Sequence, residues 1–231
     1  MKKFWKVMND IYEKVMLGVF IAALLVVIYA MYDTWYVFDQ ASDDSYLQFR
    51  PDRVNADTLP DYPITEDMVA WLTLYDTNID YPVMQGSTND EYLNKNPYGD
   101  YSLSGSIFLD SRNASDFSDT YSIIYGHHME YGKMFGALDD YLDSDYLTFH
   151  SRGELLLGRE GNTRYGLKIF YAMTADARDE KVFDTDKSEE LVEFLEAQGF
   201  DVNNRIICLS TCAGDVSSTR TVVFAYILEN E

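Results

Sequence analysis

The sequence predicts a mainly β domain, folded as a single barrel or sandwich, that follows one membrane-spanning helix. From Met68 onward, most apolar segments are short and rich in β-branched and aromatic residues, which is typical of strands. Near the N-terminus, an apolar run of 17 residues occupies positions 15–31. Many short strands with a few inserted helices favour one closed or layered β domain.

The apolar run at 15–31 is expected to be an uncleaved membrane anchor. It contains no charged residue, and its length is near the ~17–25 residues that cross a bilayer as a helix. A signal-peptide cleavage site would need small residues, and Ala30 preceded by Ile28 is a poor match. A buried core helix is the other alternative. The flanking charges are four lysines before the run and four aspartates after it: Lys2, Lys3, Lys6, Lys14, Asp33, Asp39, Asp43 and Asp44.

This charge asymmetry predicts both the orientation and the domain plan. Cytoplasmic flanks carry the excess of lysine and arginine, so the N-terminus is expected in the cytoplasm and the remainder outside the cell. We expect a cytoplasmic N-terminus at 1–14, a transmembrane signal-anchor helix at 15–32, a juxtamembrane helix and linker at 33–60, and an extracellular domain at 61–231.

The composition excludes a general nucleic-acid binder. The chain has 231 residues, 47% of them hydrophobic, so it can build a sizeable core. Its net charge of −21 would repel phosphate. Solubility of an exposed surface is the simplest explanation of this acidity.

Eight segments are predicted as strands, and the first two as a hairpin. Residues 69–75 and 79–85 flank the turn-like tripeptide Asp76-Thr77-Asn78. The remaining candidates follow along the chain, at 106–110, 121–126, 154–158, 165–173, 205–212 and 219–228.

Three short helices are expected within the domain. Thr88 and Glu91 have the spacing of a capping box, which predicts a short helix after them. A second helix is expected at 133–142. The strongest signal lies at 188–198, where a serine cap and early glutamates begin the helix and Gly199 ends it.

The two cysteines, Cys208 and Cys212, are not expected to pair with each other. In a strand their Cα atoms would lie roughly 13 Å apart at about 3.3 Å per residue, whereas a disulfide needs about 7 Å or less. Cys208 lies in the apolar run IICL and is predicted to be buried and structural. Cys212 ends the strand in polar surroundings. Because an unpaired extracellular cysteine needs a reason, Cys212 is the candidate nucleophile.

Histidine is scarce, and a cysteine nucleophile needs an imidazole to exchange its proton and to protonate a leaving amine. His127 and His128 follow the predicted strand 121–126, although a strand-end histidine is more often structural. His150 is expected in a turn or on the surface. A metal site is disfavoured, because neighbours in a strand point to opposite faces and HHME lacks the HExxH spacing.

Arg220 opens the last predicted strand, eight residues after Cys212. If the segments 205–212 and 219–228 are adjacent antiparallel strands, the loop between them returns this guanidinium to the thiol. A permanently charged fork of donors there can stabilise an oxyanion or orient a carbonyl. Considered alone, Arg220 would be assigned as a solvated arginine near a loop.

These motifs together resemble the sortase family. LSTC is similar to the TLxTC-type active-site signature, with Leu209, Thr211 and Cys212 in register and Cys208 where that signature has threonine. YGHHM resembles the Gly-His element of the family, and Arg220 matches its arginine. The order histidine, cysteine, arginine and the N-terminal anchor agree as well. SGSIFLD, IDYPVMQ with the following YLN, and the predicted helix 188–198 make the segment 60–231 similar to class B sortases.

The resemblance implies an eight-stranded β-barrel with an N-terminal helical extension and inserted helices. It implies Cys212 as nucleophile, His127 as its acid/base partner with His128 as the alternative, and Arg220 at the oxyanion. Substrate contacts are expected at positions beside the catalytic ones: Tyr125, Ser210 and Thr211. No metal and no cofactor are expected.

The resemblance also implies the reaction and its partners. Cys212 would attack a carbonyl in the C-terminal sorting signal of a secreted protein and leave a thioester. An amine of a peptidoglycan cross-bridge or a pilin lysine would then resolve it. Two alternatives remain at this point: a hydrolytic cysteine protease with the same dyad, and a non-catalytic, membrane-tethered binding domain.

Overall fold

The computed structural model of the protein describes residues 1–41, 45–53, 63–212 and 218–229, with the backbone alone at positions 40, 41 and 212. The chain divides into two compact units, Met1–Gln40 and Ala41–Glu231. The predicted domain plan has its anchor in the first unit and its β domain in the second.

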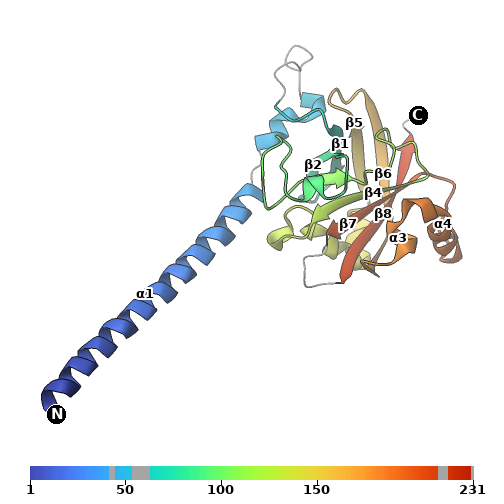
Figure 1. Ribbon diagram of the computed structural model, residues 1–231. Helices are drawn as coiled ribbons and strands as arrows, with labels where there is room; N and C mark the ends of the chain where they lie inside the picture. Colours follow the sequence, from blue (N-terminus) through green and yellow to red (C-terminus); the bar gives the residue numbers. More distant parts are fainter. Residues whose placement is uncertain (42–44, 54–62, 213–217, 230–231) are drawn as a thin grey trace. The chain divides into compact units, whose positions relative to one another are not determined.

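The first unit is a single helix, α1, which runs over Lys2–Ala41 (Figure 1). By length and composition, its portion Lys2–Asp39 is long and apolar enough to cross a membrane. The sequence predicted a separate juxtamembrane helix after position 32, but α1 continues without a break to Ala41, and no proline or glycine occurs between positions 32 and 41. Positions 42–44 and 54–60 of the predicted linker lie outside the described residues.

The second unit is a closed barrel of eight strands, which confirms the predicted fold class. The strands follow one another around the barrel in the order β1-β2-β3-β4-β7-β8-β6-β5. Their bounds are Met68–Leu74 for β1, Asp80–Met84 for β2, Ile107–Leu109 for β3, Tyr121–His127 for β4, Arg152–Leu157 for β5, Thr163–Asp176 for β6, Ile206–Cys212 for β7 and Thr219–Glu229 for β8.

Six of the eight pairings in the barrel are antiparallel, and β2 with β3 and β4 with β7 are parallel. The predicted hairpin at 69–85 is the antiparallel pair of β1 and β2. A parallel pair requires a long crossover, and the crossover between β4 and β7 contains β5, β6 and the helices between β6 and β7. Both ends of β4 and β7 therefore coincide, which brings the predicted histidine and cysteine to one rim.

The helical elements of the second unit are short. The α-helices are α2 over Ser144–Phe149, α3 over Glu180–Phe183 and α4 over Ser188–Ala197, and α3 and α4 lie together beside the barrel (Figure 1). The 3-10 helices are η1 over Ser45–Phe49, η2 over Pro51–Arg53, η4 over Glu91–Leu93, η5 over Glu130–Gly132, η6 over Gly136–Leu142 and η7 over Thr185–Lys187.

The predicted helix starts were wrong in detail. Thr88 and Glu91 form no capping box; instead the Glu91 carboxylate accepts the Ser87 backbone N–H at 2.9 Å, before a single 3-10 turn. The helix expected at 133–142 is the 3-10 helix η6. Ser188 is the first residue of α4 rather than its cap, and the capping position is Lys187, whose side chain makes no capping hydrogen bond. Gly199, with φ of +89°, ends α4 as predicted.

Candidate active site

Three neighbouring strands bring His127, Cys212 and Arg220 into one row of the barrel. In the parallel pair of β4 and β7, His127 is the Cα partner of Cys212. In the antiparallel pair of β7 and β8, Ser210 is the partner of Val222, so the same register two residues further places Arg220 opposite Cys212. The side chain of Cys212 lies outside the described residues.

The imidazole of His127 is half-buried and held by the main chain. Its Nε2 lies 2.7 Å from the carbonyl oxygen of Leu93. A carbonyl oxygen only accepts hydrogen bonds, so Nε2 donates in this contact. In the neutral ring, Nδ1 is then the nitrogen that can take up a proton.

The glycine before His127 is required by packing. A Cβ on Gly126 would lie 2.8 Å from the Phe135 ring and would overlap the Cδ1 atom of Ile107. The backbone oxygen of His127 also accepts the Phe135 N–H at 3.0 Å. Close packing against this turn therefore sets the position of the β4 end.

The other two histidines have different partners. His128 Nε2 lies 2.7 Å from Asp139 Oδ2 on the 3-10 helix η6. His150 ends α2, where its Nδ1 donates to the Tyr146 carbonyl at 2.9 Å and its ring stacks on the Tyr146 ring at 3.9 Å. His127 is thus the histidine in the row with Cys212.

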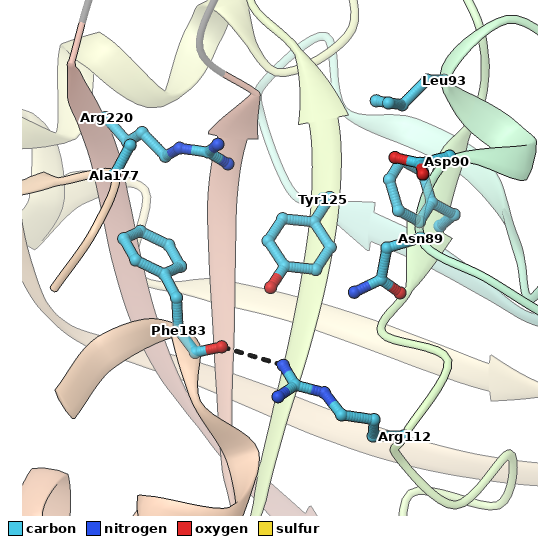
Figure 2. A pocket seen from close by; sticks show the side chains of 9 residues that line it. Asn89, Asp90, Leu93, Arg112, Tyr125, Ala177, Phe183 and Arg220 are labelled. Atoms are coloured by element: carbon cyan, nitrogen blue, oxygen red, sulfur yellow. Dashed lines mark hydrogen bonds between the residues drawn. The ribbon is translucent and has the colours of Figure 1, made fainter. Parts of the chain in front are cut away.

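A pocket of about 320 Å³ includes Arg220 in its wall (Figure 2). In Figure 2, Tyr125 lies between the side formed by Arg220 and Phe183 and the side formed by Asn89 and Asp90. Tyr125 precedes His127 by two residues in β4, so both side chains project to the same face of the strand. The complete lining is Asn89, Asp90, Leu93, Phe108, Arg112, Tyr125, Ala177, Phe183 and Arg220.

Arg220 faces this pocket without a carboxylate partner among the described residues. Its guanidinium carbon lies 5.2 Å from the centre of the Phe183 ring, within the range of a cation–π contact. Its Nε is buried, and in the part of the chain that the structure describes no hydrogen-bond acceptor reaches it. Arg220 therefore has donor capacity left for a bound group.

Next to the pocket, the fully buried Asp110 accepts hydrogen bonds from the side chains of three residues. Arg112 binds it through Nε and Nη2, both at 2.9 Å, Asn89 donates at 2.9 Å and the Tyr125 hydroxyl donates at 3.1 Å. Burial by itself would raise the pKa of Asp110, but the hydrogen bonds from Arg112 and Asn89 outweigh it and the pKa is lowered. Burial, with the Asp110 charge beside it, raises the pKa of Tyr125, which stays a neutral hydroxyl. Asp110 therefore ties three lining residues of the pocket, Asn89, Arg112 and Tyr125, to one carboxylate.

The other predicted substrate contacts lie next to the row and are buried. Ser210 is the β7 partner of Tyr125, and its hydroxyl donates to the Thr211 carbonyl at 3.1 Å. Thr211 Oγ1 accepts the backbone N–H of Thr221 at 3.0 Å. Contact between substrate and Tyr125, Ser210 or Thr211 stays a prediction.

Sequence reasoning did not identify Asn89, Arg112 or Phe183 as lining residues. Phe183 belongs to α3, a four-residue helix with no periodic signal, and reaches the pocket only through the fold. Arg112 follows β3 by three residues and donates to the Phe183 carbonyl at 2.9 Å (Figure 2). In the residues described, no group of three or more histidine, cysteine and carboxylate side chains is arranged to hold a metal.

Cys208 is buried in β7, as the sequence predicted. Burial raises the pKa of its thiol to about 12. It therefore remains a neutral, poorly nucleophilic thiol at physiological pH.

Comparisons with known proteins agree with this geometry. The sortase domain model matches residues 72–228. Sortase B of Listeria monocytogenes is 39% identical over 160 residues, which is 64% of each chain, so the match spans slightly less than two thirds of that relative. Sortase B of Staphylococcus aureus is 33% identical over 179 residues, or 72% of each chain.

Solved structures give the same assignment. A Staphylococcus aureus sortase B–substrate complex superposes with a TM-score of 0.63 at 32% identity, over 73% of this chain and 82% of that one. A Streptococcus pyogenes class B sortase involved in pilus biogenesis superposes with a TM-score of 0.63 at 35% identity, over 71% of this chain and 94% of that one. The chain, with its closed barrel and its row of histidine, cysteine and arginine on adjacent strands, belongs to the sortase family of cysteine transpeptidases and is similar to the class B members.

Proposed function

We propose that this protein is a transpeptidase in which Cys212 is the nucleophile, His127 the acid/base and Arg220 the oxyanion stabiliser. The observation that supports the proposal is the strand register, which pairs His127 with Cys212 and, when the β7–β8 register is continued two residues beyond Ser210–Val222, brings Arg220 opposite Cys212. Residues opposite one another in a sheet project to the same face, so thiol, imidazole and guanidinium can meet around one carbonyl.

In the first half-reaction, the Cys212 thiol gives its proton to Nδ1 of His127 and its sulfur attacks the scissile carbonyl carbon. The negative charge that develops on the carbonyl oxygen is stabilised by the donors of Arg220. When the C–N bond breaks, the His127 imidazolium protonates the departing amine, and a thioester remains.

In the second half-reaction, a primary amine attacks the thioester carbonyl. A new C–N bond forms, the C–S bond breaks, and the proton released by the amine returns through His127 to the thiol. We propose a C-terminal sorting signal of a secreted protein as the acyl donor and an amine of the cell wall or a pilin lysine as the acceptor. Support for these partners comes from the relatives solved with substrate and involved in pilus biogenesis.

We further propose that α1 anchors the enzyme with its N-terminus in the cytoplasm and the barrel outside. The lysines before the apolar run and the aspartates after it support this orientation. A protease added to intact cells would then digest the barrel. Protection of the barrel in intact cells would contradict the orientation.

The full chain in detergent, mixed with a library of sorting-signal peptides, tests the chemistry. We expect intact-mass analysis to detect an acyl adduct on the wild type and none on Cys212→Ala. Adding hydroxylamine should convert the peptide product to the hydroxamate. Water-derived product that does not change with hydroxylamine would indicate a hydrolytic protease, and peptide transfer that survives in Cys212→Ala would overturn the assignment of the nucleophile.

A further inference from the structure

We propose that Asp139 is a positioning residue, which ties the ends of β4, β7 and β8 together on the face opposite the pocket and so sets the spacing of the three reactive side chains. This inference rests on the proposed function, because it concerns the residues assigned to the reaction there. Asp139 lies on the 3-10 helix η6, outside the three strands that it joins.

Each carboxylate oxygen of Asp139 has its own donor. Oδ2 accepts from His128 Nε2 at 2.7 Å, and Oδ1 accepts from the Thr221 hydroxyl at 2.5 Å. The backbone N–H of Thr221 then donates to Thr211 Oγ1 at 3.0 Å. A single carboxylate therefore links the ends of three strands through His128, Thr221 and Thr211.

Each of the three residues linked by Asp139 is adjacent in sequence to one residue of the reactive row, which is formed by His127, Cys212 and Arg220. His128 follows His127, Thr211 precedes Cys212, and Thr221 follows Arg220. Because successive residues in a strand project to opposite faces, Thr211 and Thr221 lie on the other side of the sheet end from Cys212 and Arg220, and His128 lies one residue beyond the end of β4. A displacement of the network would move the backbone of the row.

The network lies where the backbone ladder stops. The last Cα pair in the described β7–β8 ladder is Ser210 with Val222. Beyond it, the side-chain oxygen of Thr211 receives the N–H of Thr221. Between β7 and β8, the alignment of Cys212 with Arg220 is therefore supported by this side-chain hydrogen bond, whereas the ladders to β4 and β6 hold the other edge of each strand.

Burial makes the hydroxyls in this network hard to replace with water. Thr211 is 4% exposed and Thr221 is 7% exposed. Asp139 and the His128 ring are each 48% exposed, so their substitution leaves the core intact. The network therefore contains two buried threonines, Thr211 and Thr221, through which a displacement would reach the backbone of the row. It also contains an exposed residue, Asp139, that can be substituted without unfolding the barrel.

A matched pair of substitutions at Thr221 tests the inference in the full chain. Thr221→Val keeps the shape of the side chain but removes the hydroxyl, whereas Thr221→Ser retains the hydroxyl. Asp139→Asn weakens the same network from its exposed end, and Asp140→Asn, at the neighbouring exposed carboxylate, is the control. The readouts are kcat and KM for peptide transfer, the rate of Cys212 alkylation by iodoacetamide, and the melting temperature.

We expect Thr221→Val and Asp139→Asn to lower kcat about tenfold or more, because small displacements of reacting groups are costly, with KM within about twofold of wild type. Thr221→Ser and Asp140→Asn should remain close to wild type. Thr221→Val that folds normally and retains wild-type kcat and alkylation rate would overturn the positioning role. Absence of peptide transfer in the wild type would instead count against the proposed function, and the alkylation rates, which need no substrate, would still decide the role of Asp139.

Discussion

At the scale of single residues, the chemistry of the site depends on which ionisable groups have partners. His127 donates to a carbonyl, His128 contacts a carboxylate, and Arg220 has a buried Nε with no acceptor among the described residues. His127 and His128, which are adjacent in sequence, therefore have different hydrogen-bond partners.

Arg220→Lys should lower kcat by about 10²–10³-fold, the range observed when an oxyanion donor is lost. The ammonium retains the charge but not the planar fork of donors. Arg178→Lys, at an exposed arginine, is the matched control. Near-normal turnover of Arg220→Lys would contradict the oxyanion role.

The two cysteines should differ in reactivity. Burial raises the pKa of Cys208 to about 12, so its thiol stays protonated as the pH rises through 8 and ionises only near pH 12 or after unfolding. We expect iodoacetamide at pH 8 to leave native Cys212→Ala unmodified by intact-mass analysis, and to modify it once denaturant is added. Rapid modification of the native variant would show that β7 opens at Cys208.

At the scale of elements, the end of β4 is set by packing against the turn that follows it. A side chain at Gly126 would meet the Phe135 ring and Ile107 Cδ1. This contact explains why a glycine precedes His127, and it predicts that one added methyl group at position 126 disturbs the end of β4.

Gly126→Ala should lower the free energy of unfolding by about 1–3 kcal/mol, as overpacking does in well-packed cores. Ile107→Val removes the Cδ1 atom that the new methyl group would overlap. We therefore expect Gly126→Ala to cost less in the Ile107→Val background, measured by chemical denaturation of all four chains of the double-mutant cycle. Equal costs in both backgrounds would contradict the packing explanation.

At the scale of the whole molecule, a charged cluster fastens η1 and η2 to the barrel. The buried Arg50 beside η2 forms an ion pair with Glu154 on β5, and Arg164 on β6 binds the other Glu154 oxygen at 2.7 Å. Loss of Arg50 would leave the buried Glu154 with Arg164 alone, and breaking a buried ion pair is strongly destabilising. The barrel unit therefore includes the segment Ser45–Arg53 and is compact without α1.

A chain that begins at Ala41 should leave the membrane fraction and retain its melting temperature and thioester formation. A chain that begins at position 54 loses Arg50, and we expect it to melt about 10 °C lower, from a loss of about 3 kcal/mol or more. Differential scanning calorimetry distinguishes the two. Equal melting temperatures would show that the Arg50 cluster does not stabilise the barrel.

Local patterns were enough to predict the strands and a barrel or sandwich, whereas the closed eight-stranded barrel and the roles of His127, Cys212 and Arg220 came from the resemblance to the sortase family. Strand content follows from β-branched and aromatic runs such as 219–228, and Gly199 ends α4 because glycine adopts positive φ without strain. The capping box at Thr88 and Glu91 was wrong, because the Glu91 carboxylate finds the Ser87 N–H and a lysine instead. Both partners lie within four residues of Glu91, so the spacing of two residues alone does not decide which local hydrogen bond forms.

The sequence by itself determined the residue types, the order of histidine, cysteine and arginine, and the apolar N-terminal helix, because these depend on composition and short-range periodicity. Only the tertiary structure decided that His127 rather than His128 shares a row with Cys212, that Phe183 and Arg112 line the pocket, and that Asp139 joins three strand ends. The physical reason is that strand register and contacts across a closed barrel are long-range: they depend on the parallel pairing of β4 with β7 across a crossover that contains two other strands.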